Sequence, residues 1–171
     1  MPANSLDPVI AGQIRFELDP AIRLQSPRLI EGLRLWESVR GNRPLPARRD
    51  FDPLSIPLGL LPHVVLIDIV PQAVPRLRWR LLGTHITKAL GRDKTGTWWD
   101  EIYPADVEAS LGQAPRYVAR ERRPVRLIGT APFEARSFMH SEALHCPLSS
   151  DGQTVDMVIG FVQFLGVDQE P

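Results

Sequence analysis

The sequence predicts a single α+β domain built on an antiparallel sheet. Two observations support this fold class. The apolar spacing is helical near the N-terminus and strand-like afterwards, and the strand segments form a group of two and a group of three with helical segments between them. Parallel α/β folds alternate strands and helices regularly, so this grouping favours an antiparallel sheet. The length of 171 residues is that of one ordinary domain.

An amphipathic helix is expected at residues 27–40, after an irregular arm over residues 1–25. Ser26 suits the N-cap, Pro27 the first helical position, and Gly41 the left-handed stop. One apolar stripe follows the helical period: Leu29, Ile30, Leu33, Trp36 and Val39. We divide the chain into the arm and helix (1–41), the main domain (42–166) and a tail (167–171).

The stretch 42–63 contains many prolines and predicts a packed connector. Asp52-Pro53 repeats the cap-plus-proline signal, and Leu54, Leu58 and Leu61 have the spacing of a short amphipathic helix. We expect the six Leu and Ile residues of this stretch to be buried.

A strand hairpin is expected next. Residues 64–70 form a continuous apolar run, and residues 77–83 alternate, so that Leu77, Trp79 and Leu81 share one face. The prolines between the two runs indicate the turn.

Three helical segments are expected at residues 84–90, 98–103 and 105–122. Pro115 lies inside the last of them, and proline costs about 3 kcal/mol in a regular helix. We therefore expect a kink or break near residues 112–115.

Three further strands are expected at residues 124–129, 137–148 and 155–165. The sequence Ser150-Asp151-Gly152 is a strong turn signal between the last two. The expected order is therefore a two-stranded hairpin, then helices, then a meander of three strands.

Five stretches together resemble the bacterial family of short proteins that consist of one PAS domain with an N-terminal helical extension. They are LWESVRG, LPARRDFDP, LLPHVVLIDIV, LRWRLLGTHITKALGRDKTG and PLSSDGQTVDMVIG. The resemblance implies a five-stranded antiparallel sheet of order 2-1-5-4-3, with helices on one face. It also implies a sensory or signal-transduction module that binds a small ligand or a protein partner and acts in trans without catalysis.

The central strands of that order, 64–70 and 155–165, carry apolar side chains on both faces. Helices between strands cover one face, so the other needs a second cover, because soluble monomers avoid large apolar patches. We expect the stripe of the 27–40 helix to form this interface, in cis or across a homodimer.

The composition argues against several classes of partner and cofactor. Twenty basic residues balance twenty acidic ones, which predicts no nucleic-acid or anionic-membrane partner. No secretory leader or membrane-spanning run is evident, so we expect a cytoplasmic protein. We expect no metal, because His140 and His145 point to opposite faces of one strand. We also expect no cofactor. Cys146 lies in a strand, whereas the cysteine that binds flavin in light-sensing PAS domains lies in a helix. His85 is the only histidine near the helical side, where a haem ligand would be needed.

We expect a cleft between the sheet and the helices that binds a small apolar ligand of unknown identity. The residues expected to line it are Trp79, Leu81, Ile86, Leu90, Trp98, Ile102, Val118, Leu144, Ile159 and Phe161. The alternative function is a small enzyme of the isomerase or dehydratase type, which needs a buried acid or base in that cavity. Its candidates are Asp68, His140 and Glu142, and the last two share a strand face.

Overall fold

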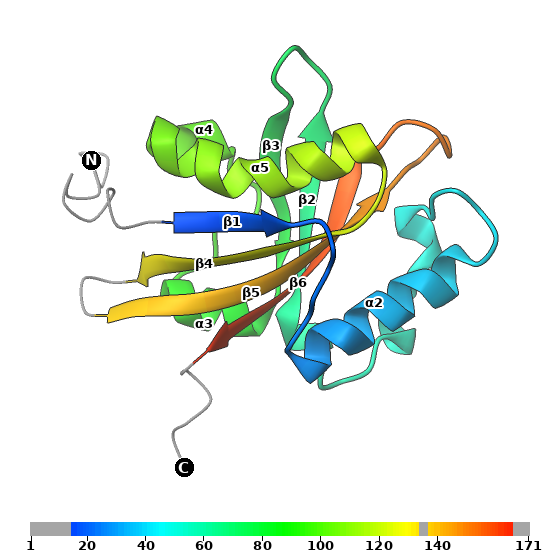
Figure 1. The fold of residues 1–171 in the computed structure, drawn as a ribbon, viewed down its shortest axis with the longest axis horizontal. Coiled ribbons are helices and arrows are strands. Elements are labelled where there is room, and N and C mark those ends of the chain that lie inside the picture. The colour runs from blue at the N-terminus through cyan, green and yellow to red at the C-terminus, as the bar shows by residue number, and fades with distance from the viewer. Residues whose placement is uncertain (1–14, 134–136, 166–171) are drawn as a thin grey trace.

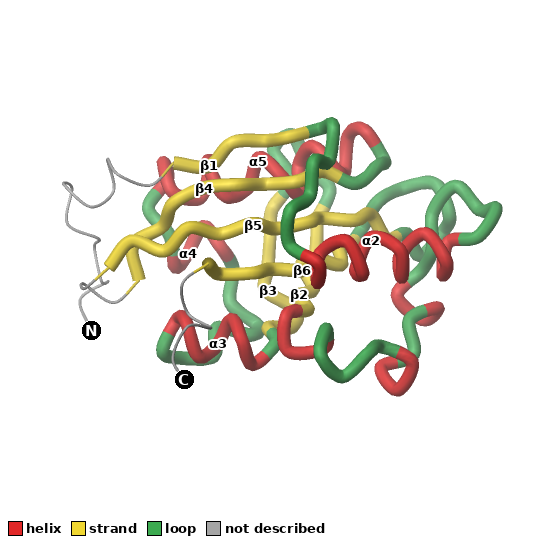
Figure 2. The backbone as a smooth tube through the Cα atoms, turned by 60° about the horizontal axis from the view of Figure 1, so that its bottom comes forward, coloured by secondary structure: helices red, strands yellow, loops and turns green. Residues whose placement is uncertain are grey.

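A computed structural model describes residues 15–133 and 137–165 (Figures 1 and 2). It has a six-stranded antiparallel sheet of order β1-β4-β5-β6-β2-β3. The strands are β1 (Arg15–Asp19), β2 (Val64–Val70), β3 (Arg76–Leu82), β4 (Val125–Phe133), β5 (Ser137–Leu148) and β6 (Met157–Leu165). The helices are α2 (Pro27–Arg40), α3 (Thr84–Leu90), α4 (Trp99–Ile102) and α5 (Ala105–Glu121), with 3-10 turns η1 (Arg48–Asp50), η2 (Pro53–Ser55) and η3 (Leu61–His63).

The predicted order of five strands is confirmed: it corresponds to β3-β2-β6-β5-β4. The sixth strand, β1, comes from the arm that we expected to be irregular, so that prediction is wrong for residues 15–19. β1 pairs with β4, for example Glu17 opposite Ile128, and Gln113 of α5 donates a hydrogen bond to the carbonyl oxygen of Phe16. Five residues with a distant partner give too little local signal to predict a strand. Residues 20–25 form a turn and an irregular link, as expected for the arm, whereas residues 1–14 and the tail lie outside the described residues.

Helix α2 has the predicted bounds and lies on the outer face of the sheet, which we define as the face opposite α3, α4 and α5 (Figure 2). Leu29 and Trp36 are buried there, and the Trp36 indole donates a hydrogen bond to the Pro147 carbonyl oxygen. A Cβ at Gly32 would lie 2.6 Å from the Phe161 ring, so the glycine permits this close approach. The stripe therefore covers the outer face in cis, and its role in a homodimer remains a prediction.

Helix α5 continues through Pro115 without a break, contrary to the expected interruption. Its buried face includes Ala114, Pro115 and Val118, which pack on the inner face of the sheet. Burial of this face offsets the missing N–H hydrogen bond, since most helix stability in proteins comes from packing.

The connector between α2 and β2 differs from its prediction. Residues 53–55 form only a 3-10 turn, in which the Asp52 carboxylate accepts a hydrogen bond from the Leu54 N–H. Ile56 and Leu60 are buried, whereas Leu54 and Leu58 are 94% and 85% exposed. Leu61 is 38% exposed as well, so the expected burial is wrong for these three leucines, whereas it is correct for Leu45, Ile56 and Leu60. Three prolines, Pro53, Pro57 and Pro62, restrict φ along this segment, and a proline inside a helix would lose its N–H hydrogen bond.

Candidate functional site

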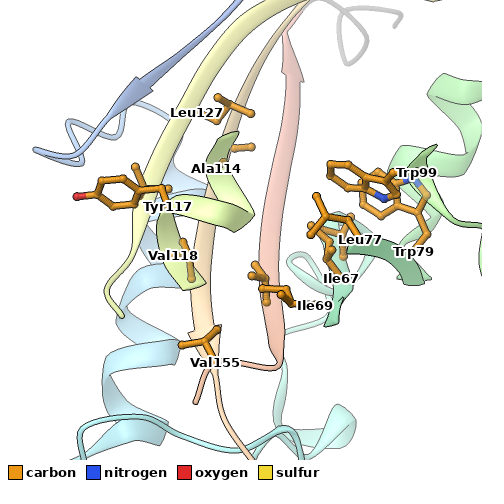
Figure 3. Close-up of a cluster of buried hydrophobic side chains, with 14 of the residues drawn as sticks. Ile67, Ile69, Leu77, Trp79, Trp99, Ala114, Tyr117, Val118, Leu127 and Val155 are labelled. Atoms are coloured by element: carbon orange, nitrogen blue, oxygen red, sulfur yellow. The ribbon is translucent and has the colours of Figure 1, made fainter. Parts of the chain in front are cut away.

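The space between the inner sheet face and the helices holds a closely packed aromatic group (Figure 3). Trp79 of β3 and Trp99 of α4 have ring centroids 4.6 Å apart, and Tyr103 meets Trp99 edge-on. The Trp79 indole donates a hydrogen bond to the Tyr103 hydroxyl, and burial raises the pKa of Tyr103 to about 12. These side chains occupy part of the region where a ligand was expected.

Five of the ten predicted cleft residues belong to this inner core: Trp79, Ile86, Leu90, Ile102 and Val118. Trp98 is only half-buried, and the guanidinium of Arg76 lies 4.0 Å from its ring centroid.

The other four predicted residues do not face the cleft. Leu144, Ile159 and Phe161 belong to the hydrophobic cluster between the outer face of the sheet and α2, which we call the outer core. Leu81 lines a small crevice on the outer face. In β5 and β6 the apolar residues occupy both faces, so their alternation did not distinguish inside from outside. In β3 the cause is a bulge: Trp79 lies opposite Ile67 and Leu81 opposite Leu66.

His145 of β5 is buried, and among the described residues its Nδ1 has no hydrogen-bond partner. Burial lowers its pKa to about 4. The unfolded state, with a His pKa of about 6.5, therefore binds a proton in the pH range 4–6.5 that the folded state does not bind. Stability contributed by neutral His145 is present above pH 6.5 and is lost as the pH falls through this range.

Replacing His145 by leucine removes this difference of about one bound proton between the unfolded and the folded state. The free energy of unfolding of the variant should therefore rise less steeply with pH between pH 4 and 6.5 than that of the wild type. Urea unfolding at several pH values measures this slope. The wild-type protein, measured over the same pH series, is the reference. An unchanged slope in the His145 variant would show that this imidazole titrates normally.

A hollow of about 760 Å³ lies on the outer face, beside the N-terminus of α2. Helix α2 contacts β5 and β6, and Figure 1 shows it at the right-hand side of the sheet, away from the left-hand ends of β1, β4 and β5. The outward side chains of four strands line the hollow, together with the start of α2: Glu17, Arg126, Ile128, Thr130, His140, Glu142, Gln163, Leu165 and Arg28. We call this hollow the outer groove.

Arg126 and Glu142 are buried at the floor of the outer groove, and together with Asp19 at the end of β1 they form an ionic network that we call the carboxylate clamp. The Arg126 guanidinium donates to Glu142 at 2.8 Å and to Asp19 at 3.2 Å. Glu142 also accepts hydrogen bonds from the backbone N–H groups of Ser26 (2.7 Å) and Gln25 (3.0 Å). The clamp therefore attaches the start of α2 to the sheet.

Asp19 holds the preceding turn in the same way. It accepts hydrogen bonds from the backbone N–H groups of Ala21 and Arg23. The side chain and backbone N–H of Arg23, together with Arg126, lower the pKa of Asp19 to about 2. Two carboxylates therefore fix the whole link between β1 and α2.

Arg126 pairs with both carboxylates of the clamp, and Arg23 pairs with Asp19 from outside it, so two guanidinium groups balance the two carboxylates. The character of the groove therefore depends on its rim. Glu17 and His140 are exposed, and His140 shares a hydrogen bond with Thr130. Arg28 donates a hydrogen bond to Gln163 at 3.0 Å. The groove thus combines both signs of charge with apolar side chains such as Ile128 and Leu165.

Of the three candidates for an acid or base, His140 and Glu142 line the outer groove, whereas Asp68 lies outside its lining. Glu142 is 3% exposed, and its carboxylate is held by Arg126 of the clamp. Asp68 accepts two hydrogen bonds from Arg78. His140 and Glu142 do share the outer face, as predicted.

A family model described as a PAS domain matches residues 24–163 of this sequence. The match includes α2 and every strand except β1, apart from the last residues of β6. The chain belongs to the PAS domain family.

Comparison with curated proteins finds no significant match. Among solved structures, a fungal LOV domain photoreceptor matches with 16% sequence identity and a TM-score of 0.45. The alignment covers 80% of this chain and 91% of the photoreceptor chain.

Two side chains of this PAS domain bear on the expectation of no cofactor. Cys146 lies in β5 and is buried in the outer core, and burial raises the pKa of its thiol well above the usual value. The ring of His85 of α3 packs against that of His63 in a tilted arrangement with centroids 4.0 Å apart, and its Nε2 accepts a hydrogen bond from the Phe164 N–H. A buried neutral thiol and an engaged imidazole are poorly placed for a flavin adduct or a haem bond.

We therefore expect the purified PAS domain to show no visible absorption band. An absorption spectrum from 300 to 700 nm checks this, with native mass spectrometry for bound mass. A flavin or haem band at stoichiometric occupancy would contradict the prediction.

Within the ranges that the structure describes, no helix has both the length and the hydropathy to cross a membrane. The same residues contain no group of three or more His, Cys, Asp or Glu side chains placed to hold a metal ion.

Proposed function

We propose that this PAS domain is a non-catalytic signalling module that binds a protein partner in the outer groove and acts through it in trans. One observation supports this most: an open groove lies directly over the clamp that attaches α2 to the sheet. A partner in the groove would contact Gln25, Ser26 and Arg28, so its binding would be coupled to the position of α2.

The composition of the groove supports a protein partner rather than the small apolar ligand expected from the sequence. Small-molecule sites are usually concave and mostly enclosed, with few polar groups. The outer groove is lined by Glu17, Arg28, Thr130, His140 and Gln163 on its polar side. Protein interfaces commonly surround an apolar centre with a polar rim of this kind.

In-cell photocrosslinking tests this proposal. A photoreactive phenylalanine analogue replaces Leu165, which lines the groove and is 55% exposed, or Val74, a control that is 63% exposed at the β2–β3 turn. We expect one heterologous protein to crosslink at Leu165 but not at Val74, and a second substitution, His140→Glu, to reduce its yield.

Two results would contradict the proposal. Crosslinking at Val74 alone, or at neither site, would show that the groove has no partner. A product containing only two copies of the chain would assign the groove to the homodimer predicted from the sequence.

A further inference from the structure

The connector between α2 and β2 presents two leucines to solvent although its neighbouring apolar residues are buried. Leu54 and Leu58 are 94% and 85% exposed, while Ile56 and Leu60, which alternate with them, are 8% and 0% exposed. Figure 2 shows this connector at the periphery of the molecule, next to α2. The two leucines face outward because the buried pair anchors the segment to the outer core.

The conformation that exposes these leucines is held by specific contacts. Asp52 accepts hydrogen bonds from the Leu54 N–H and the Ser55 hydroxyl. The Pro57 carbonyl accepts hydrogen bonds from the N–H groups of Leu60 and Leu61. Presenting apolar side chains on a rigid segment lowers the entropy that a partner must offset on binding.

An apolar crevice of about 60 Å³ borders the same segment. Its walls include Pro53 and Leu61 of the connector, Leu81 of β3 and Ile159 of β6. Leu81 reaches this crevice because the β3 bulge turns it to the outer face. A crevice of this size admits part of one aliphatic side chain. The exposed leucines and the crevice together form the connector surface.

Positive charge borders the connector surface. Arg48 lines the crevice, and both Arg48 and Arg49 are exposed. Among the described residues neither forms a salt bridge, whereas Arg43 is paired with Asp50 at 2.7 Å. A partner with carboxylates beside its apolar side chains would therefore be complementary. A second copy would bring the same arginines into the interface, which is unfavourable.

We propose that the connector surface docks an amphipathic helix whose apolar stripe is flanked by acidic residues. One side chain of that helix enters the crevice, and others cover Leu54 and Leu58. Its carboxylates pair with Arg48 and Arg49. This site is separate from the outer groove and does not depend on the function proposed for it.

Fluorescence anisotropy with two synthetic peptides tests the proposal. The first is a labelled 16-residue helical peptide with leucines at i, i+3, i+4 and i+7 spacing and glutamates at the flanking positions. The second has lysine in place of every glutamate. We expect saturable binding of the acidic peptide and at least tenfold weaker binding of the lysine peptide.

Variants of the full chain locate the binding. Leu54→Asp with Leu58→Asp should weaken the acidic peptide at least tenfold, and Arg49→Glu should also weaken it. Val74→Asp, at an exposed apolar residue elsewhere, should leave the affinity unchanged. Thermal melts of all variants should agree, because the substituted side chains are exposed.

Three outcomes would overturn the proposal. They are equal binding of both peptides, equal binding by wild type and the double leucine variant, and a concentration-dependent dimer in sedimentation that the double variant abolishes. The last would identify a second copy as the occupant.

Discussion

Replacing Trp99 by alanine is expected to lower the free energy of unfolding by about 3–5 kcal/mol, the usual cost of a large-to-small change at a buried aromatic residue. Trp99 is 1% exposed and contacts both Trp79 and Tyr103 on the inner face. Its loss leaves a cavity that the rigid sheet and helices fill only in part. Chemical denaturation monitored by circular dichroism measures the effect.

The neighbouring tryptophan provides a matched control. Trp98 is half-buried and contacts Arg76 and Arg78 by cation–π interactions, each worth about 0.5–1 kcal/mol at exposed sites. Trp98→Ala should therefore cost much less than Trp99→Ala. Equal losses from the two variants would contradict the placement of Trp99 in the core.

The second large effect is expected at Glu142. Glu142→Ala removes four hydrogen-bonding contacts from a buried carboxylate, to Gln25, Ser26 and Arg126. Arg126 then keeps Asp19 as its carboxylate partner. No charge is left unpaired, so the main cost comes from the backbone N–H groups of Ser26 and Gln25 losing their acceptor, about 1–3 kcal/mol for each buried donor. Amide hydrogen exchange should also increase in α2, because its start is no longer attached to the sheet.

Glu17→Ala is the control for this variant. Glu17 lies in the same row of the sheet, opposite Ile128, which is itself opposite Glu142, but it is exposed. Its removal should change stability by less than about 0.5 kcal/mol. If Glu142→Ala left both stability and hydrogen exchange of α2 unchanged, the clamp would not hold the helix.

Much of the fold was predictable from local patterns. The bounds of α2 follow from the Ser26-Pro27 start, the apolar stripe and the Gly41 stop, all within one segment. The hairpin of β2 and β3 and the meander of β4, β5 and β6 follow from apolar runs separated by turn residues. Each of these signals lies within one short segment, so it can be read from the sequence without knowing which segments meet in the fold.

The candidate site was predictable only in part. The shared face of His140 and Glu142 follows from their spacing of two in one strand, and it places both at the outer groove. The burial of Glu142 does not follow from that spacing, because its partners Gln25, Ser26 and Arg126 lie far away in the chain. Neither the clamp nor the groove has a signal in any one segment.

The sequence by itself determined the fold class and the helix that covers the outer face, because hydrophobic period and turn chemistry act between near neighbours. The order of five of the six strands came from the resemblance to the PAS family. Tertiary structure decided the faces of Leu81, Leu144 and Phe161, the pairing of β1, and the exposure of Leu54. When a strand carries apolar side chains on both faces, its sequence does not show which face points to the inner core. A bulge also reverses the inward and outward alternation of the residues that follow it. Both candidate surfaces of this PAS domain arise from contacts between distant segments that no local pattern contains.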